Sequence, residues 1–233
     1  MTKEVVPGVY EITTQFKAAN AFLIVEDKLT LIDTGLKGSQ SRVEKLLKEL
    51  GRSPADITQI IITHCHVDHV GSLAALKDMT GARVAVHRAD APCLSRELPY
   101  PKPKTKLVGL VVSALMLPMF NCPALTADVL LDDGSEIGAL GGLKVIHTPG
   151  HTPGHICLYS PSRRILFAGD LIGARGGKLR EPSKTYSTEL DQALASLQKL
   201  RGLQVDTLCM GHAEAITIDA GQKLAALLDE GQS

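Results

Sequence analysis

The chain contains no tryptophan, and aromatic side chains make up only 3% of its 233 residues. It also has no net charge at pH 7, because 25 Lys and Arg residues balance 25 Asp and Glu residues. A nucleic-acid-binding protein needs basic surfaces for phosphates and aromatic platforms for bases. The composition therefore argues against nucleic acid as a partner.

Membrane-spanning runs and paired cysteines are missing as well. The apolar stretch at residues 107–117 is shorter than the about 20 residues that a transmembrane helix needs. The first residues contain no apolar core of a signal peptide. Five cysteines are scattered, odd in number and without a CxxC pair. We therefore expect a cytoplasmic protein with reduced thiols and no membrane partner.

The apolar content is high enough for a full core. Hydrophobic residues make up 44% of the chain and charged residues 21%, which is ordinary for a globular protein. The length predicts one domain over residues 1–233, or two halves that share one core. Similar apolar runs precede Asp33 and Asp170, and each run ends with its aspartate in a loop. This similarity is consistent with two similar halves packed together.

Apolar periodicity predicts an α/β fold. Asp132-Asp133-Gly134 is expected to form a hairpin turn, and residues 171–187 a loop. The expected strands are 5–14, 20–33, 58–63, 83–87, 128–131, 135–137, 143–147, 155–159, 163–168 and 205–210. The expected helices are 42–50, 73–78, 189–200 and 219–228.

Residues 91–127 form an insert of different character. Regular structure is broken there by Pro99, Pro101, Pro103, Pro118 and Pro123, and the apolar stretch within residues 107–120 lies among them. Such a stretch between loops often covers a pocket. Three interpretations stay open: a lid or substrate wall, which we favour slightly, a homodimer contact, or part of the core.

Four metal-binding side chains follow directly on the apolar strand 58–63. His64 and His66 point the same way on an extended segment, because side chains alternate along a strand. One ion fits between them. Asp68 and His69 come where the chain can curl toward a second ion. The same alternation turns Cys65 away from the metal, which favours a structural thiol.

Three further donors end later strands. His151 lies in a loop stiffened by two Pro-Gly pairs, and Asp170 and His212 follow apolar runs. Imidazole and carboxylate suit zinc first, with iron or manganese as alternatives. We assign His64, His66 and His151 to one ion and Asp68, His69 and His212 to the other, with Asp170 bridging the two.

Such a set predicts hydrolytic chemistry. Two ions about 3.5–4 Å apart share a water and lower its pKa toward 7, which makes hydroxide available at neutral pH. Asp68 has a spare oxygen that can orient this nucleophile or carry its proton to the leaving group. A serine or cysteine nucleophile is not required.

Other polar residues near these donors allow more than one role. Asp33 is either a turn former or the partner of a ligand histidine's second ring nitrogen. His155 either lines the substrate pocket or is structural. His147 is structural or supports a ligand, and His87 is expected to be structural.

Four residues of the loop after Asp170 are candidates for substrate contact. Their place beside a ligand suggests that they hold an anionic substrate group, and the alternative is a solvated loop. These candidates are Arg175, Lys178, Arg180 and Tyr186.

The sequence blocks resemble the metallo-β-lactamase superfamily. HCHVDH at 64–69 matches its HxHxDH signature, and LIDTG, GHTPGH, FAGD and CMGH match its other blocks in the same order over residues 20–212. The resemblance implies an αββα sandwich with the metals at the edge of two facing sheets. It also implies the ligand assignment given above, and a glyoxalase II-like or lactonase-like hydrolase of a thioester, ester or lactone.

The chain also departs from particular branches of that family. Residues 171–178 show no pattern for a glutathione thioester, and residues 1–233 show no separate helical domain like that of glyoxalase II, so we do not expect a glutathione substrate. A mononuclear non-haem iron oxygenase acting on a persulfide is the alternative that this ligand set allows. A metal-binding protein without catalysis is a third hypothesis.

Overall fold

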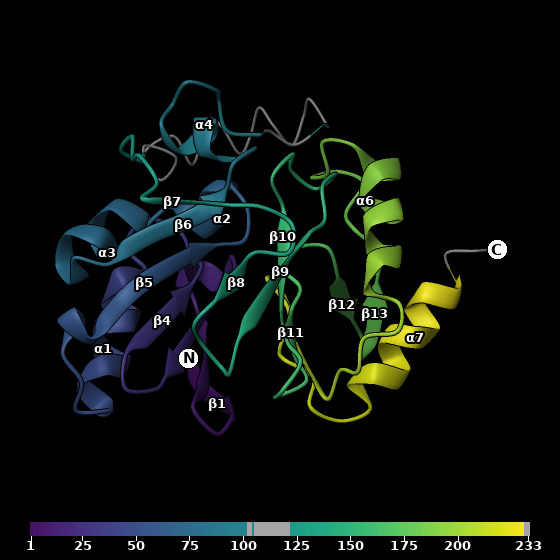
Figure 1. Cartoon of the computed structure of the whole chain (residues 1–233), viewed down its shortest axis with the longest axis horizontal. Coiled ribbons are helices and arrows are strands. Elements are labelled where there is room, and N and C mark those ends of the chain that lie inside the picture. Colours follow the sequence, from purple (N-terminus) through teal and green to yellow (C-terminus); the bar gives the residue numbers. More distant parts are fainter. Residues whose placement is uncertain (102–103, 105–121, 231–233) are drawn as a thin grey trace.

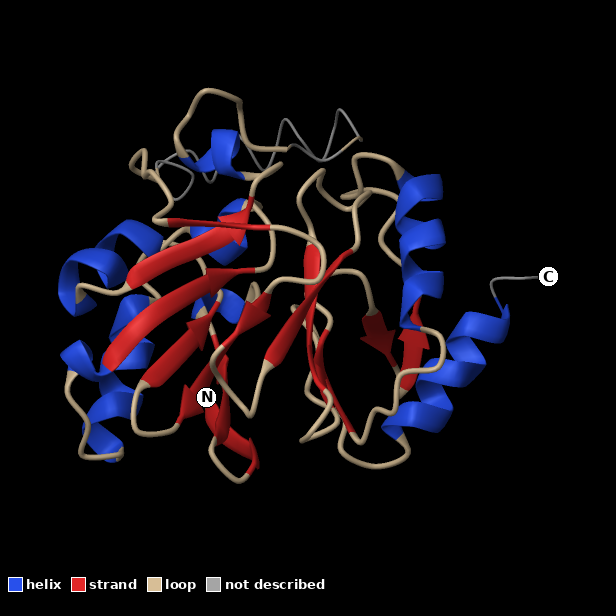
Figure 2. Ribbon diagram, in the orientation of Figure 1, coloured by secondary structure: helices blue, strands red, loops and turns tan. Residues whose placement is uncertain are grey.

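A computed structural model describes residues 1–101, 104 and 122–230 of the chain. Two β-sheets face each other, and helices cover the outer face of each (Figures 1 and 2). The helices α1 (Gln40–Glu49) and α3 (Leu73–Thr80) lie outside the first sheet, and α6 (Leu190–Leu197) and α7 (Ala220–Glu230) outside the second. The structure therefore has the αββα layers that the resemblance implied.

The first sheet has seven strands in chain order from β1 to β7. Its first four strands form an antiparallel meander, and β4 to β7 run parallel to one another. Its strands are β1 (Thr2–Val6), β2 (Val9–Thr13), β3 (Asn20–Val25), β4 (Leu29–Ile32), β5 (Ile57–Ile62), β6 (Arg83–His87) and β7 (Val129–Leu131).

The second sheet has five strands in the order β14-β11-β10-β9-β8. All pairs are antiparallel except β11 with β14, which is parallel. Its strands are β8 (Glu136–Ile137), β9 (Leu143–His147), β10 (Ile156–Ser160), β11 (Ile165–Phe167) and β14 (Thr207–Cys209), and a separate hairpin pairs β12 (Gly173–Arg175) with β13 (Lys178–Arg180).

Strand alternation divides the core into layers. On β3, Phe22 and Ile24 pack between the sheets, whereas Leu23 packs under α1 with Leu46 and Leu47. The Phe22 ring meets Phe167 of the second sheet edge to face, with centroids 5.4 Å apart. Both faces of this strand are therefore buried, which explains its almost uninterrupted apolar sequence.

Strand direction brings the loops of the two sheets to one edge. The parallel strands β4, β5 and β6 all end at the same side of the first sheet. In the second sheet β9, β11 and β14 run in a common direction, because two antiparallel steps separate β9 from β11. The segments that follow these six strands therefore meet where the two sheets face each other (Figure 1).

Three details differ from the sequence-based prediction. Residues 5–14 form two strands rather than one, and the expected loop 171–187 contains the hairpin of β12 and β13. The turn at 132–134 is not a hairpin turn. It leads from β7 in the first sheet to β8 in the second, so that the two strands never pair.

Shorter elements complete the described chain. Asp68 and His69 lie on a single helical turn, α2 (Val67–Val70), and α4 (Ala91–Leu94) follows β6. The apolar stretch predicted as lid, dimer contact or core falls at 105–121, outside the described residues. Within residues 1–101 and 122–230, no helix is both long and apolar enough to cross a bilayer. That residues 1–233 form one domain stays a prediction.

Candidate metal centre

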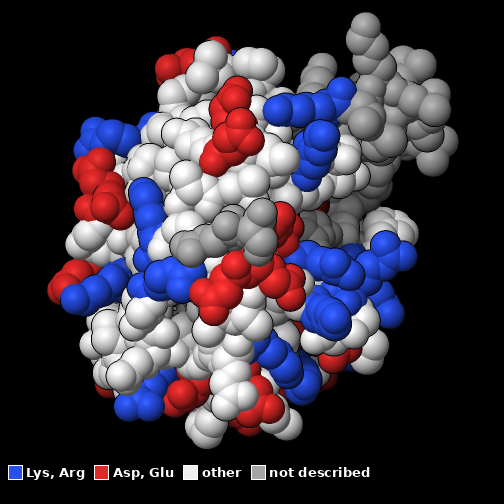
Figure 3. Space-filling view, turned by 90° about the vertical axis from the view of Figure 1, so that its right-hand side faces the viewer, with Lys and Arg blue, Asp and Glu red and all other residues white. Residues whose placement is uncertain are grey.

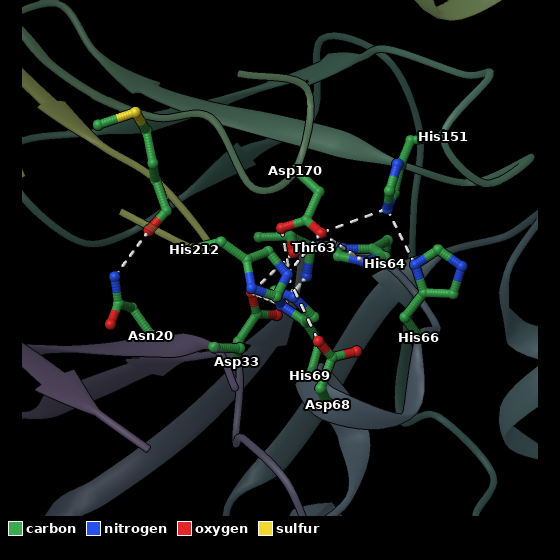
Figure 4. A network of polar contacts seen from close by, with 12 residues as sticks. Asn20, Asp33, Thr63, His64, His66, Asp68, His69, His151, Asp170 and His212 are labelled. Carbon is green, nitrogen blue, oxygen red and sulfur yellow. Dashed lines mark hydrogen bonds and ion pairs between the residues drawn. The ribbon is translucent and has the colours of Figure 1, made fainter. Parts of the chain in front are cut away.

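Seven side chains from loops far apart in sequence meet at the shared edge of the sheets (Figure 4). The donor atoms of His64, His66, His151 and Asp170 lie within 4.8 Å of one another. We call these residues the buried group. The donor atoms of Asp68, His69 and His212 satisfy the same limit, and we call them the exposed group. The structure thus places the predicted donors in the two predicted sets.

Asp170 stands between the groups. Its Oδ2 lies 2.9 Å from His212 Nε2 and 3.4 Å from His151 Nε2, and its Oδ1 lies 3.3 Å from His69 Nε2. Figure 4 shows this carboxylate reaching from the second sheet toward the histidines of the first. Asp170 is therefore the carboxylate that contacts both groups among the residues that the structure describes.

Asp33 fulfils both roles that the sequence left open. Its backbone has φ +58° in the turn after β4. Its Oδ2 accepts a hydrogen bond from His69 Nδ1 at 2.8 Å, and both its oxygens accept from Thr63. Because Nδ1 of His69 faces Asp33, Nε2 is the ring nitrogen that faces the site and could bind a cation.

The ring of His64 is fixed in the same tautomer. The Thr63 hydroxyl donates to Asp33, so it accepts from His64 Nδ1 at 3.0 Å and leaves Nε2 with a lone pair. Three buried atoms, Nε2 of His64, Nε2 of His69 and Oδ1 of Asp170, have no hydrogen-bond partner among the described residues. A cation among these atoms would compensate the charge of Asp170 and would be bound by the ring nitrogens.

The electrostatics of the cluster favour positive charge around Asp170. Burial acts to raise the pKa of Asp170, but His212 and His69 outweigh it and hold that pKa well below the ordinary range. Burial acts to lower the pKa of His69 and of His212, but the neighbouring carboxylates raise both. Burial lowers the pKa of His64 and His66, which keeps these rings neutral as ligands must be. The residues thus fit a divalent metal pair.

The fully buried thiol of Cys65 faces away from the donors. It lies in the core beneath the first sheet beside Cys93, and the contact with the Cys93 thiol, followed by burial, raises its pKa. His87 and His147 lie outside both groups and stack on each other with centroids 3.8 Å apart. Neither ring joins a group of metal-binding side chains among the described residues.

The structure places His155 in the interior, and not on the surface of a substrate pocket. It is fully buried, its Nδ1 lies 2.8 Å from the Thr148 hydroxyl, and its Nε2 accepts the backbone N–H of Asp170 at 3.1 Å. Gly169 fits beside this ring at φ +50°, where an added Cβ would lie 2.6 Å from Nε2. Both ring nitrogens are therefore occupied by protein, and the ring holds the Asp170 backbone.

The predicted substrate contacts lie on or after the β12–β13 hairpin. Arg175 and Lys178 are paired across its turn and exposed, and Arg180 is exposed as well. Tyr186 is exposed and precedes Ser187, whose hydroxyl lies 3.5 Å from His151 Nδ1. None of the four has a hydrogen bond or ion pair to the donor groups within the described chain. Their contact with substrate stays a prediction.

The face of the molecule that carries α6 and α7 shows both signs of charge side by side (Figure 3). Basic side chains there alternate with acidic ones, in keeping with the equal totals of the sequence. This face therefore offers no broad field of one sign.

Two polar residues at the site escaped the sequence-based analysis. Asn20 begins β3, and its side-chain amide donates to the carbonyls of Met210 and Ala213 on either side of His212 (Figure 4). Asp90 follows β6 and is completely buried. Asn20 stands alone in an apolar segment, and Asp90 precedes Ala91-Pro92 like an ordinary helix start, so neither carries a signal of its own.

Comparison with known proteins gives one consistent family. The sequence profile of the metallo-beta-lactamase superfamily matches residues 14–212. The probable metallo-hydrolase YflN of Bacillus subtilis is 30% identical over 92% of this chain and 87% of its own length. A hydroxyacylglutathione hydrolase of Cereibacter sphaeroides is 35% identical over 67% of this chain but only 48% of its own length, so the chain spans about half of that relative.

Solved structures share the fold. The metallo-beta-lactamase family protein TTHA1429 from Thermus thermophilus superposes with a TM-score of 0.73 at 24% identity, over 98% of this chain and 81% of that one. TTHA1623, solved in a di-iron-bound form, superposes with a TM-score of 0.67 at 26% identity, over 88% of this chain and 93% of that one.

Proposed function

Since the chain belongs to the metallo-β-lactamase superfamily, we propose that it is a hydrolase that uses two divalent metal ions to cleave a thioester, ester or lactone. The observation that carries this proposal is the carboxylate of Asp170 between two groups of donors, faced by buried ring nitrogens of His64 and His69 that have no hydrogen-bond partner among the described residues. The likeness to a hydroxyacylglutathione hydrolase supports an acyl substrate.

Each residue has a distinct task in the proposed reaction. His64, His66 and His151 would hold one ion, Asp68, His69 and His212 the other, and Asp170 both. When bound, such a pair of ions supplies a water nucleophile at neutral pH and polarises the substrate carbonyl.

Asp68 is the residue we propose for proton transfer. Its Oδ2 lies 3.4 Å from His212 Nε2, and its side chain is 26% exposed, so it reaches both the donors and solvent. A carboxylate in this place orients the attacking water, accepts its proton and passes it to the leaving alkoxide or thiolate.

Zinc is the metal we propose first, because imidazole and carboxylate donors without thiolate suit it. Iron is the second candidate, and the di-iron form of TTHA1623 supports it. The mononuclear alternative, an iron oxygenase acting on a persulfide, would need only the buried group's three histidines.

A substrate panel with metal analysis tests the proposal. Protein loaded with zinc, iron or manganese is given thioesters, lactones and phosphodiesters, and bound metal and oxygen uptake are measured in parallel. We expect turnover of a thioester or lactone with about two ions per chain. One iron per chain with oxygen uptake would instead establish the oxygenase. Substrate contact by Lys178 and Arg180 is excluded if their replacement by Ala leaves KM unchanged.

A further inference from the structure

The strongest unassigned feature is Asp90, a carboxylate buried without a positively charged partner. It follows β6 and has no exposed surface. None of the ion pairs within the described residues includes it. Burying a carboxylate costs several kcal/mol unless hydrogen bonds compensate. The three groups that donate hydrogen bonds to Asp90 therefore show which parts of the chain this side chain holds in place.

All three hydrogen bonds reach segments that carry the buried group. Oδ2 accepts from the backbone N–H of Cys65 at 2.9 Å and from the Thr152 hydroxyl at 2.7 Å, and Oδ1 accepts from the backbone N–H of Gly154 at 2.6 Å. Cys65 lies between two ligands in the first sheet, and Thr152 follows His151 beside the second. One carboxylate thus ties together the loops of both sheets.

The approach is close because position 154 has no side chain. A Cβ added to Gly154 would lie 2.6 Å from the Asp90 backbone nitrogen and 2.7 Å from its carboxyl carbon. Asp90 also heads α4 without capping it, so the carboxylate serves the loops and not its own helix. Short bonds to a charged acceptor are the strong ones, and they restrict how far the two loops can separate.

We propose that Asp90 is a positioning residue that fixes His64 and His66 relative to His151 and so sets the geometry of the buried group. His66 Nδ1 and His151 Nε2 lie 2.9 Å apart across the two sheets, and Asp90 is the side chain that joins their loops. Asp33 does the corresponding work in the exposed group, where it binds His69 directly. The proposal rests on the proposed function, because it concerns binding of the same ions.

The test uses Asp90→Asn, with Asp33→Asn as its counterpart. An amide keeps one acceptor and turns an N–H₂ toward a backbone or hydroxyl donor, so at least one loop contact is lost. Zinc is titrated into metal-free protein, and ring resonances in ¹H–¹⁵N spectra show which histidines bind. We expect Asp90→Asn to weaken zinc binding 10- to 100-fold at His64, His66 and His151, roughly the effect of a lost supporting contact. Binding at His69 and His212 should change less. Asp33→Asn should instead weaken binding most at His69, and at His64 through Thr63, while His66 and His151 change less.

Ser160→Ala is the control for a general loss of stability. The Ser160 hydroxyl is buried and donates to Leu140 O at 2.7 Å, at the end of β10 opposite the site. The Ser160→Ala variant should leave zinc binding unchanged. Equal weakening of both groups by Asp90→Asn, or no weakening, would overturn the proposal.

A second measurement separates this proposal from the proposed function. In metal-free protein, the amide hydrogens of Cys65 and Gly154 should exchange at least about tenfold faster in Asp90→Asn than in Asp33→Asn. If the wild type binds no zinc, the proposed function fails, and the exchange rates still decide whether Asp90 restrains the two loops. Thr152→Val removes a single donor and serves if Asp90→Asn does not fold; unchanged exchange and zinc binding in that variant would contradict the proposal.

Discussion

The buried and exposed groups share Asp170 but differ in their access to solvent. In the buried group the side chains of His64 and His151 are 0% and 1% exposed. In the exposed group His212 is 42% exposed and Asp68 26%. A ligand shell with little solvent contact would retain an ion, whereas an open shell would let water and substrate reach it. We therefore expect the buried group to bind its ion more tightly and the exposed group to admit water and substrate.

Stepwise removal of metal tests this division most strongly. A chelator of intermediate strength should take the ion from the exposed group first, since the side chains of His212 and Asp68 are accessible to solvent. Turnover should then fall to the uncatalysed rate, while the remaining ion still stabilises the fold by about 2.7 kcal/mol at 100 times its Kd. Metal content, activity and Tm are followed together. Full turnover with one ion per chain would contradict a two-ion mechanism.

The Asp68→Asn variant tests the exposed group directly. The amide cannot accept a proton, so kcat should fall about 10²- to 10⁴-fold, the usual contribution of general acid–base catalysis. KM should change far less. Asp78→Asn, an exposed carboxylate on α3, is the matched control and should have wild-type kinetics. A variant of Asp68 with normal kcat would remove this residue from the mechanism.

Asn20 tests whether the exposed group depends on the loop that carries His212. Its side-chain amide donates to Met210 O at 3.1 Å and to Ala213 O at 2.8 Å, and its backbone N–H to Gly211 O at 2.6 Å. Asn20→Ser removes the two amide bonds, so zinc binding at the exposed group should weaken about 10- to 100-fold. Titration of zinc into the metal-free variant measures the affinity of the exposed group.

The control for Asn20 is another side-chain amide that is remote from the site. Gln59 donates to the Thr30 hydroxyl at 2.7 Å on the inner face of the first sheet. Gln59→Ala should destabilise the fold by about 1 kcal/mol without altering zinc binding. If Asn20→Ser behaves in the same way, the His212 loop is held by other contacts.

The donor residues could be predicted because strand ends are visible in sequence. Apolar runs before Asp33, His64 and Asp170 mark three of the strands, and parallel or co-directional strands bring their ends together. The supporting residues could not be predicted in this way. Asp90 and Asn20 act through backbone groups of Cys65, Gly154 and Met210, and a backbone group leaves no mark in the sequence.

The sequence also did not reveal which strands pair with each other. Asp132-Asp133-Gly134 correctly signals a turn, but turn residues do not say whether the flanking strands join one sheet or two. Leu179, the inward residue of β13, packs into the core under α6 and α7 and anchors a hairpin in a segment rich in glycine and charge. Composition there favoured a loop, and tertiary packing overrode it.

The stacked pair of His87 and His147 gives a baseline for both groups, since it lies at the same sheet edge and belongs to no candidate metal-binding group within the described part of the chain. Burial, and then His147, lower the pKa of His87 to about 4. The unfolded chain takes up this proton near pH 6.5, so the stability from neutral His87 is complete above pH 6.5 and is lost as pH falls toward 4.

His87→Phe keeps a ring against His147 but cannot titrate. In metal-free protein, the wild type should therefore lose about 1 kcal/mol more unfolding free energy than this variant between pH 7 and pH 5, because His147 is partly exposed and solvent screens the full effect. Denaturant unfolding at the two pH values measures the difference. Equal losses of unfolding free energy in both proteins would show that the folded state accepts a proton on His87 without cost. Desolvation at this edge would then affect stability only where Asp170 and the ligand histidines are crowded together.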